Sequence, residues 1–474
     1  MKFAVPVVLF ILISGCASFH PKPVSPAGTA RAFEARTLTS PGLRAFMEKN
    51  IGRRMKPWPP ASWDLRTLAL AAAYYSPALD VMRAKWGVAN AAVITAGGRP
   101  NPSISAFGEH HSSTPGGISP WTWGLSFDIP IQTAGKRGFR IRKAKQLSDA
   151  ARLNIVETSW QVWITLKRRL LDLQAATERQ RYLLDQLLAQ KKITKLFEER
   201  LAVGEASMFE AAQSRLAMYK TRLLLADDQK ETIRARGALA QALGLQAKAL
   251  DNITISFDVF KQTPVPIDLR DLRRKALLSR ADILSALQEY EATQSALQLE
   301  LARQYPDIHL GPGYEWDQGD NRWALGFSVV LPVFNQNQGP IAQARARCKE
   351  FAAKFISLQA GVIGQIDRAE AAYAESLKNL QIADSLVQTG KDRMRTAGAR
   401  FNSGETGRLD LEQAKMELAT AELSRFDSLI SLEADLAGLE NAVQSPLNKQ
   451  EIFPEMTPVL FENLKSGKKI KAGE

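Results

Sequence analysis

The chain has 474 residues, of which 45% are hydrophobic and 23% are charged, and its formal net charge is +13. This composition is near the average for folded proteins and argues against wholesale disorder. No block of five or six consecutive Lys or Arg residues occurs, so the positive charge indicates solvated helix surfaces and no nucleic-acid partner is expected.

The N-terminus has the features of a secretory signal followed by an attachment point for lipid. Lys2 precedes a short apolar run over residues 3–13, and the letters ISGC end at Cys16. Such a run is typical of a signal peptide and too short for a transmembrane helix, which needs about 20 apolar residues. The ending resembles a bacterial lipobox, so we expect residues 1–15 to be a cleaved lipoprotein signal peptide and Cys16 to be acylated. Ala17, in place of an aspartate, favours the outer membrane. A plain signal peptide with a chance cysteine is the alternative.

The next segment, residues 16–62, contains several prolines and is expected to be a lipid-anchored tether. A helical composition then runs from Leu65 to Ala96 and stops at two glycines. Downstream of Cys16 no apolar stretch reaches 18 residues. If the mature chain crosses a membrane, it must do so as strands of a closed barrel, because open backbone polar groups cannot be left in lipid.

Two strands are expected next, at about 101–110 and 121–131. Strict alternation in the second predicts one apolar face and one small or polar face, and its length suits a tilted strand that crosses a bilayer. Its apolar positions are Trp121, Trp123, Leu125, Phe127 and Ile129, and the positions between them are Thr122, Gly124, Ser126 and Asp128.

These strands allow two interpretations. Four strands cannot enclose a conducting barrel, since even eight leave an interior filled by side chains. Either the hairpins are soluble, or several copies pool their strands around an open tube. The small residues Gly124 and Ser126, and their later counterparts Gly326 and Ser328, favour pooling.

A long proline-free helix is expected from about residue 136 to 201. Its ~65 residues would extend roughly 100 Å, a length typical of coiled-coil assemblies. Gly204 interrupts it, and a second helix covers residues 207–245. A soluble bundle or rod would explain these helices but not the strands. Apolar residues at heptad spacing are Trp163, Leu166, Leu170 and Leu173 in the long helix and Phe209, Ala212, Leu216, Tyr219, Leu223 and Ala226 in the next.

The whole arrangement is repeated about 200 residues later. The strand at 121–131 matches residues 323–333, and two helix breaks align at an offset of 200. Agreement at several ordered sites indicates an internal duplication. The aligned breaks contain Arg200, Gly204 and Glu205 in the first unit and Arg400, Gly404 and Glu405 in the second.

The duplication sets the expected domain boundaries. We expect a first unit over residues 63–250, a linker over 251–267 and a second unit over 268–445, with its strand hairpin at about 306–333. A loose periplasmic tail over residues 446–474 follows.

The lipobox, the duplicated hairpins and the long helices together resemble the TolC-like outer-membrane efflux family over about residues 63–445. The stretch TAGKRGFR at 133–140 is similar to the subgroup found in heavy-metal efflux systems. The other matching residues are Pro102 and Pro306 at the strand openings, Pro130 and Pro332 before the long helices, and the two Arg-x3-Gly-Glu breaks.

The resemblance implies a mainly α fold with a membrane β-barrel portion. In a homotrimer, each protomer would give four strands to a 12-stranded β-barrel, which an α-helical coiled-coil barrel continues through the periplasm. It implies a passive outer-membrane export duct for small molecules or metal cations. Its partners would be a periplasmic adaptor (membrane fusion) protein, an inner-membrane pump of the RND type and outer-membrane lipid. The alternatives are a type I protein-secretion duct and a lipid-anchored periplasmic structural coiled-coil protein.

The resemblance also implies sites at the helix tips. Asp410 and Gln413 fall where the family has acids that line a periplasmic gate, and their repeat mates are Glu210 and Gln213. Glutamine at the second position leaves one acid where the family has two. Alternatively, Asp410 and Glu210 are ordinary acids favoured by a helix N-terminus. The implied contacts with the adaptor are Arg200, Gly204, Glu205, Arg400, Gly404 and Glu405.

No catalytic or cofactor-binding pattern occurs in the sequence, so we expect neither an enzyme nor a cofactor. The histidines show no ligand spacing with acids or thiols, and no metal site is expected. They are His20, His110, His111 and His309. A lone helical cysteine, Cys348, is expected to be an unreactive thiol.

Overall fold

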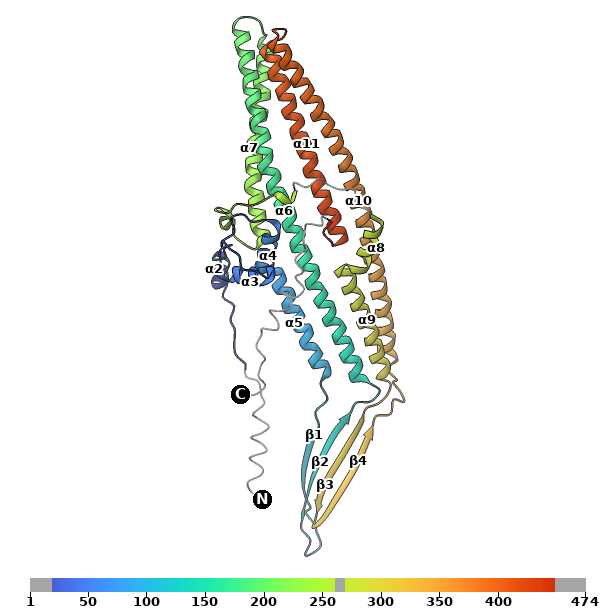
Figure 1. The fold of residues 1–474 in the computed structure, drawn as a ribbon. Helices are drawn as coiled ribbons and strands as arrows, with labels where there is room; N and C mark the ends of the chain where they lie inside the picture. The colour runs from blue at the N-terminus through green and yellow to red at the C-terminus, as the bar shows by residue number, and fades with distance from the viewer. Residues whose placement is uncertain (1–18, 261–268, 448–474) are drawn as a thin grey trace.

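The computed structural model describes residues 19–260 and 269–447. The expected signal peptide, Cys16 and the tail from residue 448 lie outside the described residues. The described chain is a long layer of helices with a sheet at one end and two helical hairpin tips at the other (Figure 1).

The segment expected to be a tether contains two short helices, α2 (Pro26–Glu34) and α3 (Pro41–Ile51). Each begins with a serine cap and a proline in its first turn, a combination that favours helix initiation. Leu38, Leu43 and Met47 are fully buried in the largest core. Part of this segment therefore belongs to the folded body.

The first long helical segment is divided in two. A single helix was expected over residues 65–96, whereas α4 (Leu65–Tyr75) and α5 (Pro77–Gly97) meet at Ser76. Pro77 has no N–H and its ring excludes the preceding helical turn, so α4 ends before it. The Ser76 hydroxyl then caps α5 by accepting the amide of Leu79 at 3.4 Å.

Four antiparallel strands form one sheet in the order β1-β2-β3-β4: β1 (Ser103–His110), β2 (Trp121–Ile131), β3 (Ile308–Asp317) and β4 (Asp320–Val329). The second hairpin is shifted from its expected position at about 306–333. Gln318 and Gly319 form a tight turn with positive φ, 51° and 114°, so β4 begins three residues before Trp323. Pro332, which cannot donate to a ladder, lies beyond its end.

The pairing register gives the sheet two different faces. Trp123 lies opposite Trp316 and Leu125 opposite Tyr314, while Gly124 lies opposite Glu315. The predicted alternation of an apolar face with a small or polar face is therefore confirmed for β2, β3 and β4. On β1, Phe107 lies opposite Gly124 and so on the small or polar face. The aromatic and aliphatic side chains of β2 and β4 on the first face are exposed.

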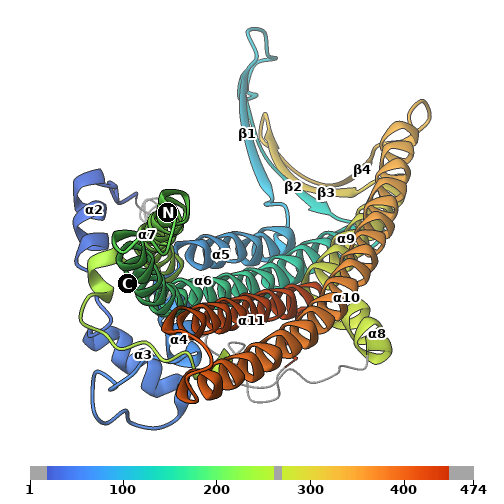
Figure 2. The same ribbon diagram turned by 90° about the horizontal axis from the view of Figure 1, so that it is seen from above.

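Two hairpins of long helices make the rest of the layer: α6 (Lys136–Ala202) with α7 (Met208–Leu243), and α10 (Gln338–Asn402) with α11 (Arg408–Val443). The shorter α8 (Leu269–Ser279) and α9 (Ala281–Ala302) precede β3. Among the tip helices, α7 contacts α6, α6 contacts α11, and α11 contacts α10. Seen from above, α7 and α10 lie at the two ends of this row of four helices, and the sheet is curved (Figure 2).

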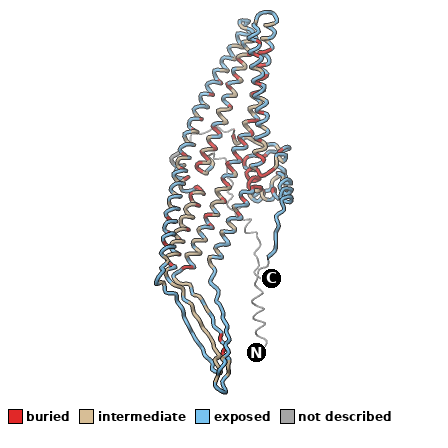
Figure 3. Tube along the Cα trace, turned by 180° about the vertical axis from the view of Figure 1, so that it is seen from behind, coloured by how far each residue is buried: buried red, intermediate tan, exposed pale blue. Residues whose placement is uncertain are grey.

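The largest core lies midway along the helices, where α3 and α4 pack on α6 and α7 (Figure 3). Trp163, Leu166 and Leu170 of the predicted heptad are buried there. The end of the first unit contributes through the short 3-10 helix Ala247–Leu250. The expected linker contributes through the 3-10 helix Asp258–Phe260 and a bridge between Trp63 and Ile255.

Candidate functional site

Each hairpin tip turns at a glycine in the left-handed conformation. Gly204 and Gly404 both have a φ of 78°, a region that is costly for a residue with a side chain. The carbonyl oxygen of Arg200 accepts the amide of Glu205 at 2.8 Å, and the matching bond in the second tip measures 2.9 Å. The structure thus places both turns where the duplicated sequence predicts a break.

The arginine and the glutamate of each tip also face each other. Nε of Arg200 lies 3.7 Å from Oε2 of Glu205, and Nε of Arg400 lies 3.4 Å from Oε2 of Glu405. Ion pairs this exposed stabilise a fold by only about 0–1 kcal/mol. The backbone turn therefore holds the tip, and the charged side chains are accessible to a partner.

The side chain of Glu210 caps the N-terminus of α7. Its Oε2 accepts both the backbone amide and the hydroxyl of Ser207 at 2.7 Å, and its own amide donates to that hydroxyl at 3.2 Å. These bonds, the backbone bond first, hold the pKa of Glu210 below its usual value. The helix-cap interpretation therefore describes Glu210 in this protomer.

Asp410 has a different environment from its repeat mate. Gly407 stands where Ser207 caps the first tip, so no side-chain cap is formed at the start of α11. Asp410 is exposed. Gln213 is exposed as well and Gln413 is half-buried. The two acids begin different helices, so they do not form one cluster in a protomer.

An acid that the sequence analysis did not single out lies beside Gln413. Glu412 is 2% exposed, and its carboxylate is 2.9 Å from Nζ of Lys415 and 3.9 Å from Nζ of Lys192 on α6. Its repeat mate is Ala212, a member of the predicted heptad. The alignment of residue 412 with Ala212 was the signal in the sequence for the burial of Glu412, because it places residue 412 on a face where helices contact each other.

The polar face of the sheet carries a hydrogen-bonded cluster that the sequence analysis also missed. Thr122 donates to Asp317 at 2.7 Å, and Arg322 lies 2.7 Å from the same carboxylate and 3.5 Å from Glu315. Residues far apart in sequence converge here through the β2–β3 pairing, which no local pattern reveals. Farther along this face, Nδ1 of His309 lies 2.9 Å from Asp128.

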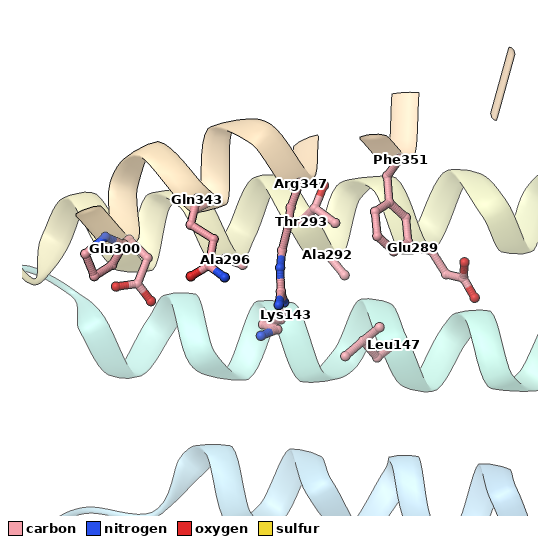
Figure 4. A pocket seen from close by; sticks show the side chains of 12 residues that line it. Lys143, Leu147, Glu289, Ala292, Thr293, Ala296, Glu300, Gln343, Arg347 and Phe351 are labelled. Atoms are coloured by element: carbon pink, nitrogen blue, oxygen red, sulfur yellow. The ribbon is translucent and has the colours of Figure 1, made fainter. Parts of the chain in front are cut away.

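A groove of about 420 Å³ lies between α6, α9 and α10. Lys143 of α6 and Arg347 of α10 point into it from opposite sides, and its apolar lining includes Phe351 of α10 and Leu147 of α6 (Figure 4). Glu300 at its end is already bound by Arg303 at 2.7 Å. The groove is a mixed surface between helices without the convergent polar groups of a catalytic site.

Two kinds of feature are absent from the residues that the structure describes. No group of three or more His, Cys, Asp or Glu side chains there could hold a metal ion. Within residues 19–260 and 269–447, no helix has the length and apolar character to span a membrane.

Comparisons with known proteins bear on both repeats. A family model described as outer membrane efflux protein matches residues 69–245 and 272–443. The cobalt-zinc-cadmium resistance protein CzcC of Cupriavidus metallidurans is 24% identical over 333 residues, which are 68% of this chain and 76% of CzcC.

Solved structures share the fold. The outer membrane protein VceC of Vibrio cholerae matches with a TM-score of 0.65 and 20% identity, over 82% of this chain and all of VceC. The CmeC outer membrane channel of Campylobacter jejuni matches with a TM-score of 0.65 and 18% identity, over 95% of this chain and 93% of CmeC.

Proposed function

Since the chain belongs to the outer membrane efflux protein family, we propose that three copies join their sheets into one barrel, through which solutes leave the cell. Family members form trimeric outer-membrane channels that extend into the periplasm and work with an adaptor and an inner-membrane pump. They are ducts and not enzymes.

The sheet is the observation that carries this proposal. Both of its edge strands, β1 and β4, lack a neighbour on one side among the described residues, and open sheet edges are not tolerated in lipid. One face is apolar and exposed, while the other is lined by small or polar residues apart from Phe107 of β1. Pairing the edge strands with those of two further copies satisfies the backbone hydrogen bonds of β1 and β4. It also makes the face with small or polar residues the lining of a water-filled channel.

The test is channel formation by the purified full chain. We expect native mass spectrometry in detergent to give a trimer, and the trimer to open conductance steps in planar bilayers. A rod-like periplasmic protein predicts neither result. A monomer that remains soluble without detergent after removal of its acyl chains would contradict the proposal.

Cys16 is proposed to anchor the mature N-terminus in outer-membrane lipid. The lipobox-like ending supports this, and Cys16 lies outside the described residues. Labelled palmitate should enter the native chain and should be absent from Cys16→Ser, whereas Cys348→Ser should keep the label. Label in Cys16→Ser would contradict the assignment.

The transported substrates are proposed to include divalent transition-metal cations, with an RND-type pump as the inner-membrane partner. The relative CzcC, named for cobalt, zinc and cadmium resistance, supports this class. Deleting the gene should lower growth on salts of these metals, and the native chain should restore growth. If the deletion left metal tolerance unchanged but abolished tolerance of organic drugs, the substrates would be organic drugs and not metal cations.

The two tips are proposed to contact the adaptor, and Asp410 is proposed to line the gate. Gly204 and Gly404 keep the tips turned at positive φ, which proline cannot adopt. Gly204→Pro combined with Gly404→Pro should abolish efflux and adaptor cross-linking while trimers still reach the outer membrane. Loss of the trimer itself would assign the defect to folding.

A further inference from the structure

The segment that joins α3 to α4 forms a pocket rich in positive charge. Its volume is about 370 Å³, and we call it the collar pocket. Over residues 44–66 the chain has six Lys or Arg and two Asp or Glu. Asp64 is the acid among the lining residues. The cationic lining residues are Arg53, Arg54, Lys56 and Arg66, all exposed to solvent.

The two carboxylates of this segment already have other partners. Oδ1 of Asp64 accepts the amide of Thr67 at 2.8 Å and its hydroxyl at 2.7 Å, and this bonding caps α4. Oε1 of Glu48 accepts Nε of Arg44 at 2.9 Å and the amide of Met55 at 3.0 Å. The collar pocket therefore keeps an excess of positive charge.

The backbone of the collar pocket is held in place by the folded body. Ile51 and Met55 of the lining pack against the largest core. Nε1 of Trp58 donates to the carbonyl of Thr39 at 3.1 Å, and a guanidinium nitrogen of Arg44 donates to the carbonyl of Met55 at 3.4 Å. Because the backbone is fixed, the four like charges stay near one another, and a bound anion relieves their mutual repulsion.

The collar pocket lies far from both ends of the helical layer (Figure 1). The core against which it packs includes Trp160 and Trp163 of α6, and α6 begins at Lys136 beside the sheet. At a rise of 1.5 Å per residue, Trp160 lies about 36 Å from the start of α6. The turn at Gly204 lies about 60 Å beyond Trp163. A lipid headgroup at the sheet and an adaptor at the tips are both too distant, so the anion must come from the space between them.

We propose that the collar pocket binds the peptide stems of the cell wall, a glycan polymer whose stems carry free carboxylates. Arginine holds a carboxylate with two parallel hydrogen bonds. Exposed ion pairs are weak one at a time, but three pockets of a trimer and the repeated stems of a polymer allow several contacts at once, which raises the overall affinity. This attachment goes beyond the proposed function and takes from it only the placement of the pocket in the periplasm.

Sedimentation of the purified full chain with isolated peptidoglycan sacculi, in detergent, tests the proposal. We expect the native chain to pellet with the sacculi at low salt and to be released at about 1 M salt, where the Debye length is about 3 Å. Arg53→Glu combined with Arg66→Glu should lower the affinity at least about tenfold, and the glutamine pair at the same positions should lower it less. The matched control is Arg31→Glu with Lys248→Glu, which changes the net charge equally at exposed positions outside the lining and should bind like the native chain.

Two further probes identify the ligand. Sacculi whose carboxylates have been converted to amides should not bind the native chain, and vesicles of phosphatidylglycerol should not distinguish the native chain from Arg53→Glu with Arg66→Glu. Pocket-dependent binding of the vesicles or of the adaptor, without binding of sacculi, would overturn the proposal in favour of a lipid or protein partner.

Trimer formation and conductance of each variant separate this inference from the proposed function. If the glutamate pair formed normal conducting trimers and bound sacculi as well as the native chain does, the inference would be wrong and the proposed function would stand. If the native chain bound sacculi through the collar pocket but gave neither trimers nor conductance, the proposed function would fail and the contact with the wall would remain.

Discussion

A single difference between the repeats separates the two candidate gate acids. Ser207 binds the carboxylate of Glu210, whereas Gly407 offers no hydroxyl at the equivalent place before Asp410. The carboxylate of Glu210 is therefore held in its cap, whereas no cap fixes the carboxylate of Asp410, so in the proposed trimer we expect Asp410 to be the acid that turns toward the axis. Three like charges around a narrow axis repel one another, hold back anions and attract cations.

Asp410→Ala should raise single-channel conductance and weaken block by multivalent cations. The attraction between unit charges about 8 Å apart is about 2 kcal/mol at an effective dielectric constant of about 20, so half-block should need at least about tenfold more cation. Planar-bilayer recording measures both quantities. Glu210→Ala is the control and should leave them nearly unchanged; equal effects of the two variants would remove the distinction.

Asp228 on α7 is buried, and its Oδ2 has no hydrogen-bond partner in the described chain. Burial raises the pKa of this carboxyl above its ordinary value. The folded state therefore binds the proton more tightly than the unfolded chain, and the charged form lowers stability at neutral pH. That cost disappears as the pH falls through the folded-state pKa.

Asp228→Asn should accordingly stabilise the protein at pH 7 by about 1 kcal/mol. The difference should shrink as the pH approaches the folded-state pKa from above. Thermal unfolding followed by circular dichroism in detergent measures it. Asp185→Asn, which removes the same charge from an exposed position on α6, should have no such effect, and a destabilised Asp228→Asn protein would contradict the expectation.

The sequence held part of this residue-level information. Ser207 and Glu210 have the spacing of a capping box, a signal that separates Glu210 from Asp410, although both acids were kept as gate candidates in the sequence analysis. The buried state of Asp228 was not available in the same way. Which face of a long helix is covered depends on how four helices pack, and heptad spacing alone does not decide it.

At the scale of elements, local signals predicted most boundaries. Gly204 and Gly404 end long helices that begin and end within a few residues of the expected positions, because proline and glycine act locally. The shift of β4 arose from the Gln318-Gly319 turn, which was not identified as a tight hairpin. The packing of Leu38, Leu43 and Met47 was missed because three apolar residues are too few to show a period.

One buried ion pair joins the two repeats. Nζ of Lys167 on α6 lies 2.6 Å from Oε2 of Glu440 on α11, and both side chains are at most 1% exposed. Oε1 of Glu440 also accepts the amide of Leu447 at 3.0 Å. Removing one member of such a pair takes a close opposite charge away from a buried group, and losses of up to about 3–5 kcal/mol follow.

Glu440→Gln should therefore lower the unfolding free energy by up to about 3–5 kcal/mol, while Lys167→Met combined with Glu440→Gln should recover part of the loss. The double variant keeps an amide oxygen for Leu447. Asp427→Asn, which breaks the half-exposed pair with Arg179, is the control and should cost less than about 1 kcal/mol. Denaturant unfolding in detergent measures all of these variants, and a double variant no more stable than the single one would count against this explanation.

At the scale of the whole molecule, the protomer is incomplete by itself. Its sheet exposes Trp323, Leu325 and Phe327 on one side, and α7 and α10 expose apolar side chains toward the tip end. These features lie at opposite ends of the helical layer (Figure 1). Closure into a ring covers the tip surfaces with protein and the sheet surface with lipid, so one symmetric assembly accounts for both.

Neighbouring residues on β4 offer a matched test of this assembly. Leu325 lies on the apolar face, whereas Ala324 lies opposite Gly313 on the small face. Leu325→Arg should place a charge in lipid at a cost of about 2–4 kcal/mol per chain near the bilayer midplane and reduce the amount of trimer in the outer membrane. Ala324→Arg should assemble normally but lower cation conductance, because three added positive charges then surround the water-filled path. Membrane fractionation and bilayer recording separate the two effects. If both variants assembled equally well with unchanged conductance, the two faces of the sheet would not be the lipid and water faces of a barrel.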